Sequence, residues 1–514
     1  VLTAQTDGST AWASAGGGGG ASDIDGLSDA KSGGTNFTDS LILGHQSTGS
    51  LSSATFNVVV GTTAMTSLTS GASNTAVGSY AGATTTSGGL NTYIGYKAGR
   101  YLTTDNYNTV LGYNALGSAN TRTGETAYNV VIGANAANAV TTANNLIAVG
   151  YNALGANTSG HSNTAIGQNS LGANLTGTLN TGLGYDTLVG NTTGTRNLAL
   201  GYKALDAPDT EDDNIAIGYN ALGGAVAGGE KNVVIGNYAG DALTTADGTT
   251  LVGHKAGSAI TTGAYNVALG YQALDAVTTS GQNVAIGYNA LGLCTSGNNV
   301  AIGGDAGRIV TSGNQNVMVG YATGYYLTST ANTLVGYGAG DNVSSGGNNT
   351  LIGVTAGGAI NTGTDNIMLG RNAGDNITSG DNNVIIGAID ADSATADDQL
   401  IVASGDGGVT WITGNSTGGI FSKAGVVAVT GNTTLTQGQS GAYVYWTAGT
   451  LTLPVDPIVG TQFTVFNNTG SSATVALGSG DAMQNGWASN AATADNDATT
   501  YVCLESDKWV QVGA

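Results

Sequence analysis

Apolar and polar residues alternate in short segments that recur along most of the chain. In residues 283–291 the sequence Asn-Val-Ala-Ile-Gly-Tyr-Asn-Ala-Leu places Val284 and Ile286 on one face and Ala285 and Gly287 on the other. This period of two is typical of a β-strand. Thr-Ser-Gly clusters, as at residues 311–313, follow these segments and indicate turns. Each repeat therefore predicts a short strand followed by turns.

The repeat has a nearly constant length. Its motif glycine recurs 21 times between Gly44 and Gly387, and sixteen of the twenty spacings are 17 residues. Units of fixed length that each stack on their neighbours form solenoids. We therefore predict an all-β, elongated parallel β-solenoid or β-roll over residues 39–389. If each coil advances about 4.8 Å, twenty steps give a rod of roughly 100 Å. The pattern leaves the handedness of the coil open.

Asparagine stands four residues before the motif glycine in 18 of the 21 repeats. Identical amides one coil apart can donate to and accept from each other, as they do in cross-β stacks. We therefore expect a structural ladder of hydrogen-bonded amides. Its members include Asn74, Asn91, Asn163, Asn266, Asn283 and Asn349.

Small residues occupy the second face of the predicted strands, as Ala285 and Gly287 do. Such residues often mark the close approach of another backbone. A thin coil with mostly Ala, Val and Ile inside buries little apolar surface, so this small-residue face needs a cover. We expect other copies of the chain to supply it, most simply as a homotrimer.

Composition and charge exclude several classes of protein. The 514 residues include 86 Gly, 12 Lys or Arg and 33 Asp or Glu, for a formal charge of −21. Such a chain repels phosphate backbones, which argues against a nucleic-acid partner. No apolar run approaches the roughly 20 residues of a membrane span, so we expect no membrane insertion. Cys294 and Cys503 are too few for a disulfide framework and are expected to be buried free thiols.

The two ends of the chain differ from the repeats. Residues 1–38 contain five consecutive glycines and predict a linker or neck. Residues 390–421 predict a cap or neck, because the period stops after Gly387. Residues 422–514 carry most of the bulky aromatics and several short strand-like segments, which indicates a small antiparallel β-sandwich. Phe463 and Tyr501 are expected in its core.

A loop of this C-terminal domain is the candidate receptor-binding site. Trp487 follows Asp481 and Asn485 there. An aromatic ring beside Asp and Asn can stack on a sugar or anchor a protein contact. The alternative for Trp487 is packing within the domain.

Candidate chemistry is sparse elsewhere. Asp209, Glu211, Asp212 and Asp213 interrupt one repeat and predict a solvated turn rather than the paired carboxylates of a glycosidase. The histidines His45, His161 and His254 stand at different repeat positions, so neither a catalytic triad nor a zinc site is supported. We therefore expect no enzymatic activity and no cofactor. Calcium prefers carboxylate and amide oxygens, and the candidates for a structural ion are Asp390, Asp392, Asp397 and Asp398, or Asp495 and Asp497.

The repeats carry a family resemblance. Residues 129–136, Asn-Val-Val-Ile-Gly-Ala-Asn-Ala, are similar to the repeats of trimeric autotransporter adhesin heads, which form left-handed parallel β-rolls. The longer period and Gly-Tyr-Asn-Ala-Leu at residues 112–116 more closely resemble repeats in phage tail fibres, particularly those of marine cyanobacterial phages. Residues 1–14 and 22–31 also resemble segments of fibre proteins.

The resemblance implies a virion tail fibre. Such a fibre is extracellular, joins an upstream fibre or virion protein, and carries a distal knob that binds a glycan or protein on the host cell surface. The alternative is a bacterial trimeric surface adhesin with the same type of head. The adhesin family ends in a heptad stalk and membrane-anchoring strands. This sequence shows no heptads and ends in residues 509–514, which do not resemble such strands, and this favours the fibre.

Overall fold

The structure is a computed structural model. It describes residues 2–4, 10–12, 30–32, 39–44, 51–117, 126–414, 420–422, 427–436, 443–447, 450–454, 461–467, 473–476, 482–483, 490–493, 498–505 and 508–512. The chain divides into two units, Val1–Ala331 and Asn332–Ala514, and each is described by itself.

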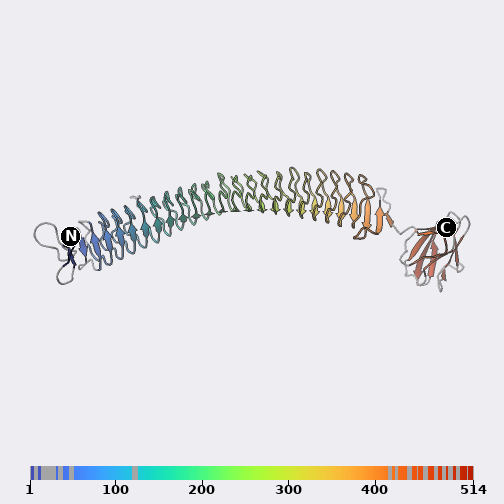
Figure 1. Ribbon diagram of the computed structural model, residues 1–514, viewed down its shortest axis with the longest axis horizontal. Helices are drawn as coiled ribbons and strands as arrows, with labels where there is room; N and C mark the ends of the chain where they lie inside the picture. Colours follow the sequence, from blue (N-terminus) through green and yellow to red (C-terminus); the bar gives the residue numbers. More distant parts are fainter. Residues whose placement is uncertain are drawn as a thin grey trace. The chain divides into compact units, whose positions relative to one another are not determined.

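The first unit is a parallel β-solenoid with one three-residue strand in each coil. Consecutive strands pair in parallel, usually with an offset of 17 residues, as Val267 pairs with Val284. Figure 1 shows these strands side by side, with the turns of each coil on the opposite side. The strands are β4 (Leu41–Leu43), β5 (Val58–Val60), β6 (Thr75–Val77), β7 (Thr92–Ile94), β8 (Thr109–Leu111), β9 (Val130–Ile132), β10 (Ile147–Val149), β11 (Thr164–Ile166), β12 (Thr181–Leu183), β13 (Leu198–Leu200), β14 (Ile215–Ile217), β15 (Val233–Ile235), β16 (Thr250–Val252), β17 (Val267–Leu269), β18 (Val284–Ile286), β19 (Val300–Ile302) and β20 (Val317–Val319).

The motif glycine ends each strand in a conformation that other residues rarely adopt. Gly270 has φ +144°, and a Cβ atom there would lie 2.4 Å from the carbonyl oxygen of Gly287 in the next coil. Both the backbone conformation and the close approach of the next coil require glycine. This requirement explains why glycine is the most regular feature of the repeat.

The small-residue face of the strand lies inside the coil, which corrects one prediction. Ala285, at the centre of β18, is fully buried, whereas Val284 and Ile286 beside it face outward. Ala290, Leu291 and Cys294 of the same coil are also fully buried. The small-residue face is therefore covered by the chain's own coil and needs no second copy. In this coil Leu291 fills the interior beside the alanines.

Leucine in a left-handed turn supplies much of the apolar interior. Leu274 and Leu291 have φ of 55° and 49° and are fully buried. A left-handed conformation costs a non-glycine residue roughly 1–2 kcal/mol. Burying a leucine side chain contributes about 1.5–3 kcal/mol, which offsets that cost. The repeated Ala-Leu pair after the motif glycine thus closes the coil.

The N-terminal end of this sheet is covered by an antiparallel strand. β3 (Ala30–Ser32) pairs antiparallel with β4, and farther upstream β1 (Leu2–Ala4) and β2 (Thr10–Trp12) form an antiparallel hairpin. This short strand takes up the backbone groups on the outer edge of β4.

The second unit starts with the same parallel coils. Its strands β21 (Thr333–Val335), β22 (Thr350–Ile352), β23 (Ile367–Leu369), β24 (Val384–Ile386) and β25 (Leu400–Ala403) pair consecutively in parallel. Strand β25 lies beyond residue 389, so the predicted end of the solenoid was one coil too early. Ala403 takes the place of the motif glycine there, which hid this coil from the glycine count.

An antiparallel reversal follows β25. β26 (Thr410–Gly414) pairs antiparallel with β25, and β27 (Ile420–Ser422) pairs antiparallel with β26. Residues 390–421 therefore hold one further coil and a two-strand cap.

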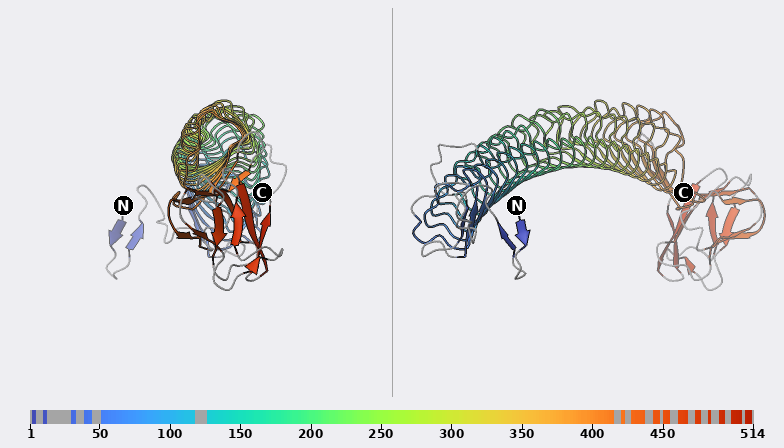
Figure 2. Two further views of the ribbon diagram at one scale, coloured as in Figure 1. Left: turned by 90° about the vertical axis from the view of Figure 1, so that its right-hand side faces the viewer. Right: turned by 60° about the vertical axis from the view of Figure 1, so that its left-hand side comes forward.

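The C-terminal part forms two sheets, seen in orange and red in Figure 2. One has the order β28-β30-β32-β36-β37-β34 and the other β29-β31-β33-β35. The strands are β28 (Val427–Val429), β29 (Thr433–Thr434), β30 (Tyr443–Trp446), β31 (Leu451–Thr452), β32 (Gln462–Asn467), β33 (Ala473–Ala476), β34 (Ala482–Met483), β35 (Asn490–Thr493), β36 (Ala498–Glu505) and β37 (Lys508–Val512).

The predicted antiparallel pairing applies only to part of this domain. β28, β30 and β32 pair in parallel, because the chain alternates between the two sheets and returns to the first in the same direction. Antiparallel pairs appear later, between β32 and β36 and between β36 and β37. The core contains Trp446, Phe463, Tyr501 and Trp509, all buried, as expected for Phe463 and Tyr501.

Candidate functional site

Buried asparagines run through the solenoid as a hydrogen-bonded column. Asn91 is 1 % exposed, and its amide nitrogen donates to the Asn74 Oδ1 atom at 3.1 Å and to the Asp105 carbonyl at 2.7 Å. Its Oδ1 atom accepts the backbone N–H of Asn108 at 2.9 Å. Similar bonds recur at the other predicted positions, which are Asn74, Asn163, Asn266, Asn283 and Asn349. These residues are structural, since their polar atoms are occupied inside the coil.

The outward face of the strands is aliphatic. In β5 to β20 the third residue of every strand is Val, Ile or Leu, and the first is Val, Ile, Leu or Thr. Leu269 is 48 % exposed, and neither position carries a charge in these sixteen strands. We call these two rows the outer aliphatic face. Contiguous apolar surface of this kind commonly marks a contact site.

Aromatic rings form a column beside this face. Consecutive ring centroids are 5.1–6.1 Å apart, and most of the rings are stacked face to face. The members are Tyr185, Tyr202, Tyr219, Tyr238, His254, Tyr271 and Tyr288. In the coil between those of Tyr288 and Tyr321, Gly304 holds this position, so the aromatic column is interrupted there. Because stacked rings cover each other's faces, this column offers mainly ring edges to a ligand.

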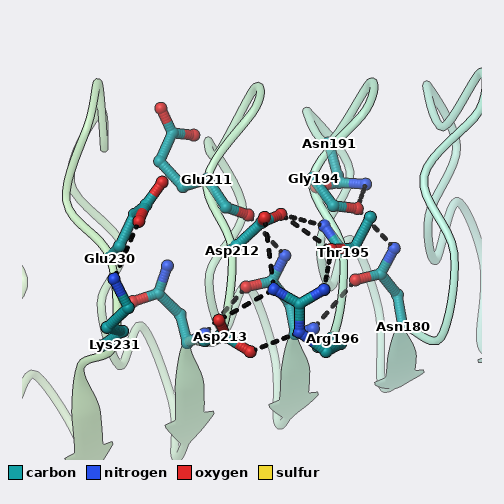
Figure 3. Close-up of polar contacts among 12 residues, drawn as sticks. Asn180, Asn191, Gly194, Thr195, Arg196, Glu211, Asp212, Asp213, Glu230 and Lys231 are labelled. Atoms are coloured by element: carbon teal, nitrogen blue, oxygen red, sulfur yellow. Dashed lines mark hydrogen bonds and ion pairs between the residues drawn. The ribbon is translucent and has the colours of Figure 1, made fainter.

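The acidic cluster at residues 209–213 is used within the fold. Figure 3 shows Arg196 beside Asp212 and Asp213 of the next coil. Its Nε atom lies 2.6 Å from Asp213 Oδ1, and Arg196 holds the pKa of Asp213 below its usual value. Glu211 is only 3 % exposed and accepts the backbone N–H groups of Asp209 and Gly228 at 2.7 and 2.8 Å. The prediction of a solvated turn is therefore wrong for Glu211.

The cluster shows a second, repeated contact. The Asp212 Oδ1 atom accepts the backbone N–H of Thr195, one coil earlier, at 2.6 Å. Asp212 stands two residues before the ladder position. We call this position in every coil the capping column, because in seven coils its side chain accepts a backbone N–H of the preceding coil.

The two described histidines have structural surroundings. The His161 Nδ1 atom accepts the Asn144 N–H at 3.2 Å, and His254 stacks on Tyr271. His45 lies outside the described residues. Cys294 and Cys503 are buried free thiols, and burial raises the pKa of Cys294.

The calcium candidates at residues 390–398 do not converge. Asp397 caps the Asp381 N–H at 2.8 Å, while Asp390 faces Asp375. Burial and this neighbour raise the pKa of Asp375 to about 6. Within the described ranges, His, Cys, Asp and Glu side chains nowhere gather in threes around a point that could hold a metal. Asp495 and Asp497 lie outside those ranges.

The predicted receptor-binding residues Asp481, Asn485 and Trp487 also lie outside the described residues, so that site stays a prediction.

A hollow that sequence reasoning missed lies in the solenoid. It measures about 380 Å³ and is lined by Ala264, Tyr265, Ser280, Gly281, Gln282, Gly297 and Asn298. A signal was present in the sequence: the capping column carries three small residues in a row there, Ala264, Gly281 and Gly297.

Comparisons add no relative. No protein-family model, no curated protein and no solved structure matches the chain. Among the described residues, no helix has the length and apolar character that crossing a bilayer would take.

Proposed function

We propose that this chain is a non-enzymatic, adhesive virion fibre of the phage tail type. The solenoid spaces the C-terminal domain from the particle, and that domain binds a glycan or protein on the host cell surface. One observation carries the proposal: in-register coils are joined inside by buried asparagine side chains that bond from one coil to the next. Such a repeat builds a long scaffold rather than a catalytic cavity.

Self-association is part of the proposal, on a different face from the one that the sequence suggested. The outer aliphatic face repeats once per coil over β5 to β20. A partner that covers it continuously must repeat at the same spacing, and a second copy of this chain does so. Burying it among three chains would remove exposed side chains such as Leu269 and Ile302 from water. Three chains would also present three copies of the receptor site, which raises avidity.

The test is deletion of residues 422–514 from the chain. The shortened protein should keep its β-sheet circular dichroism and oligomeric mass, but should lose adsorption to host cells. Undiminished adsorption would contradict receptor binding by the C-terminal domain. The described part of that domain has its own core around Trp446, Phe463 and Trp509, so its removal leaves the solenoid interior intact.

A bacterial trimeric surface adhesin is the second candidate. The adhesin-like repeat at residues 129–136 favours it, and β9 places Val131 inside the coil with Val130 and Ile132 outside. The genes beside the coding sequence distinguish the two functions. Virion structural genes support the fibre, and a membrane-anchor segment in the full gene supports the adhesin.

A further inference from the structure

The hollow at Tyr265 is a gap in the capping column. In seven other coils an Asn, His or Asp of this column accepts a backbone N–H of the preceding coil at 2.6–3.2 Å. Four of the seven acceptors are carboxylates, those of Asp212, Asp247, Asp381 and Asp397. The position is therefore one where this fold repeatedly binds a carboxylate oxygen.

At the hollow the acceptor is missing in two successive coils. The residues that would cap the N–H groups of Ala264 and Gly281 are Gly281 and Gly297, which have no side chain. Within the described part of the chain, no group accepts a hydrogen bond from either N–H. The two residues that carry these donors, one coil apart, both line the hollow of about 380 Å³. This volume lies in the range of small-ligand sites, roughly 300–1,000 Å³.

Side chains around the gap suit a sugar. Tyr265 is 63 % exposed, and no other ring stacks on it among the described residues. Gln282 and Asn298, in the following two coils, are also exposed, and no described residue bonds to either side-chain amide. An aromatic face with amides at its edge can pack against a pyranose ring and bond its hydroxyls.

We propose that this hollow binds an acidic sugar of a polysaccharide, a uronate or a similar carboxylate-bearing pyranose. Its carboxylate accepts the N–H groups of Ala264 and Gly281, as Asp212 accepts that of Thr195. The ring packs on Tyr265, and its hydroxyls bond Gln282 and Asn298. The inference deepens the proposed adhesive function, because it names a glycan class and adds a site on the solenoid. Only the biological purpose of this site depends on the proposed function; the binding itself does not.

The protein's formal charge of −21 opposes any anionic ligand at long range. Salt screens that repulsion over roughly 8 Å at physiological ionic strength, whereas the hydrogen bonds act at contact. The nearest acid in the capping column, Asp247, is already bonded to the Glu230 N–H at 2.8 Å. Binding should therefore persist, or strengthen, as salt is added.

The test is calorimetric titration of the full chain with a polyuronate oligosaccharide and with a neutral glucan of equal length. The wild-type protein should bind the polyuronate at least tenfold more tightly than the glucan. Tyr265→Asn should weaken polyuronate binding at least tenfold. Tyr128→Asn is the matched control, because Tyr128 is 60 % exposed at the equivalent position but Asn144 caps the neighbouring N–H at 2.7 Å. Asn suits the positive φ of both positions.

A pair of charge changes tests the carboxylate itself. Gln282→Lys should tighten polyuronate binding and Gln282→Glu should weaken it, each by roughly fivefold, while glucan binding stays unchanged. The fold accepts both residue types there, since Lys231 and Asp213 hold the equivalent position. No polyuronate binding by the wild type, or equal losses for Tyr265→Asn and Tyr128→Asn, would overturn the site. Equal binding of the neutral glucan would overturn the carboxylate assignment. Neither result affects the adsorption test of the C-terminal deletion.

Discussion

Replacing one ladder asparagine should weaken the solenoid by far more than a typical surface substitution. Asn91 is fully enclosed and makes hydrogen bonds to three residues: Asn74, Asp105 and Asn108. Asn91→Ala removes the partner of the Asp105 carbonyl and of the Asn108 N–H. Neither group can reach water without opening the coil, because Asp105 and Asn108 are themselves 2 % and 1 % exposed.

The magnitude follows from these two groups. A buried donor or acceptor left unsatisfied costs about 1–3 kcal/mol. Two such groups, partly relieved by local movement, give an expected loss of about 3 kcal/mol, a large share of the roughly 5–15 kcal/mol that stabilises a folded domain. Asn91→Thr should lose less, because Thr249 already occupies a ladder position and its hydroxyl donates to Asn232 Oδ1 at 2.8 Å.

Native-state hydrogen exchange of the Asn108 amide measures this loss locally. A decrease of about 3 kcal/mol in opening free energy corresponds to exchange roughly 150-fold faster. Asn91→Asp adds a pH signature. The ionised carboxylate would face the Asp105 carbonyl at neutral pH, whereas the protonated form can donate to it, so acidification should restore part of the stability. A loss below about 1 kcal/mol for Asn91→Ala would refute the structural role of the ladder.

Three further predictions concern other parts of the chain. Gly270→Ala should cost about 3 kcal/mol in urea unfolding, because it combines positive φ with a clash against Gly287; Gly228→Ala, which has positive φ but open space, should cost about 1 kcal/mol, and equal costs would contradict the close-approach argument. The pKa of Asp375 is raised from an ordinary 3.8 to about 6, so its contribution to stability is present below pH 3.8 and is lost as pH rises through about 6. The thermal midpoint should therefore fall over that pH window, and Asp375→Asn should flatten this fall. An unchanged slope in the variant would contradict the assignment. Cys294 is buried and its thiol pKa is raised, so it should react with a thiol reagent at neutral pH only after unfolding, and immediate reaction would contradict its burial.

The repeat and its strand were predictable because they depend on backbone requirements that the sequence displays. A glycine that must adopt positive φ beneath the next coil cannot vary, so Gly270 and its equivalents set the period. An asparagine that bonds to the one before it leaves a row of identical residues. The coil of strand β25 was not predicted because Ala403 stands where the motif glycine is expected, although Ile401 keeps the buried central position.

The orientation of the strands was not predictable from alternation alone. Alternation separates two faces without saying which one is inside, and the larger residues Val284 and Ile286 suggested the interior. The structure places Ala285 inside the coil and Val284 and Ile286 outside. Leu291 enters the interior of the same coil from a left-handed turn and fills the space beside Ala285.

The hollow at Tyr265 was missed for a different reason. No motif marks it, since its defining feature is the absence of side chains at Gly281 and Gly297 in neighbouring coils. Glycine in a turn is ordinary in a single repeat. Only the hydrogen bonds made by Asp212 and its equivalents show that a partner is missing at these positions.

The solution mass of the chain tests the central claim most directly. Light scattering should give the mass of three chains for the wild type. Leu269→Lys, which places a charge on the outer aliphatic face, should shift the mass toward one chain. Gln272→Lys should remain trimeric, because Lys255 already holds the equivalent position one coil earlier. A single-chain mass for the wild type, or equal masses for both variants, would contradict a fibre assembled through this face.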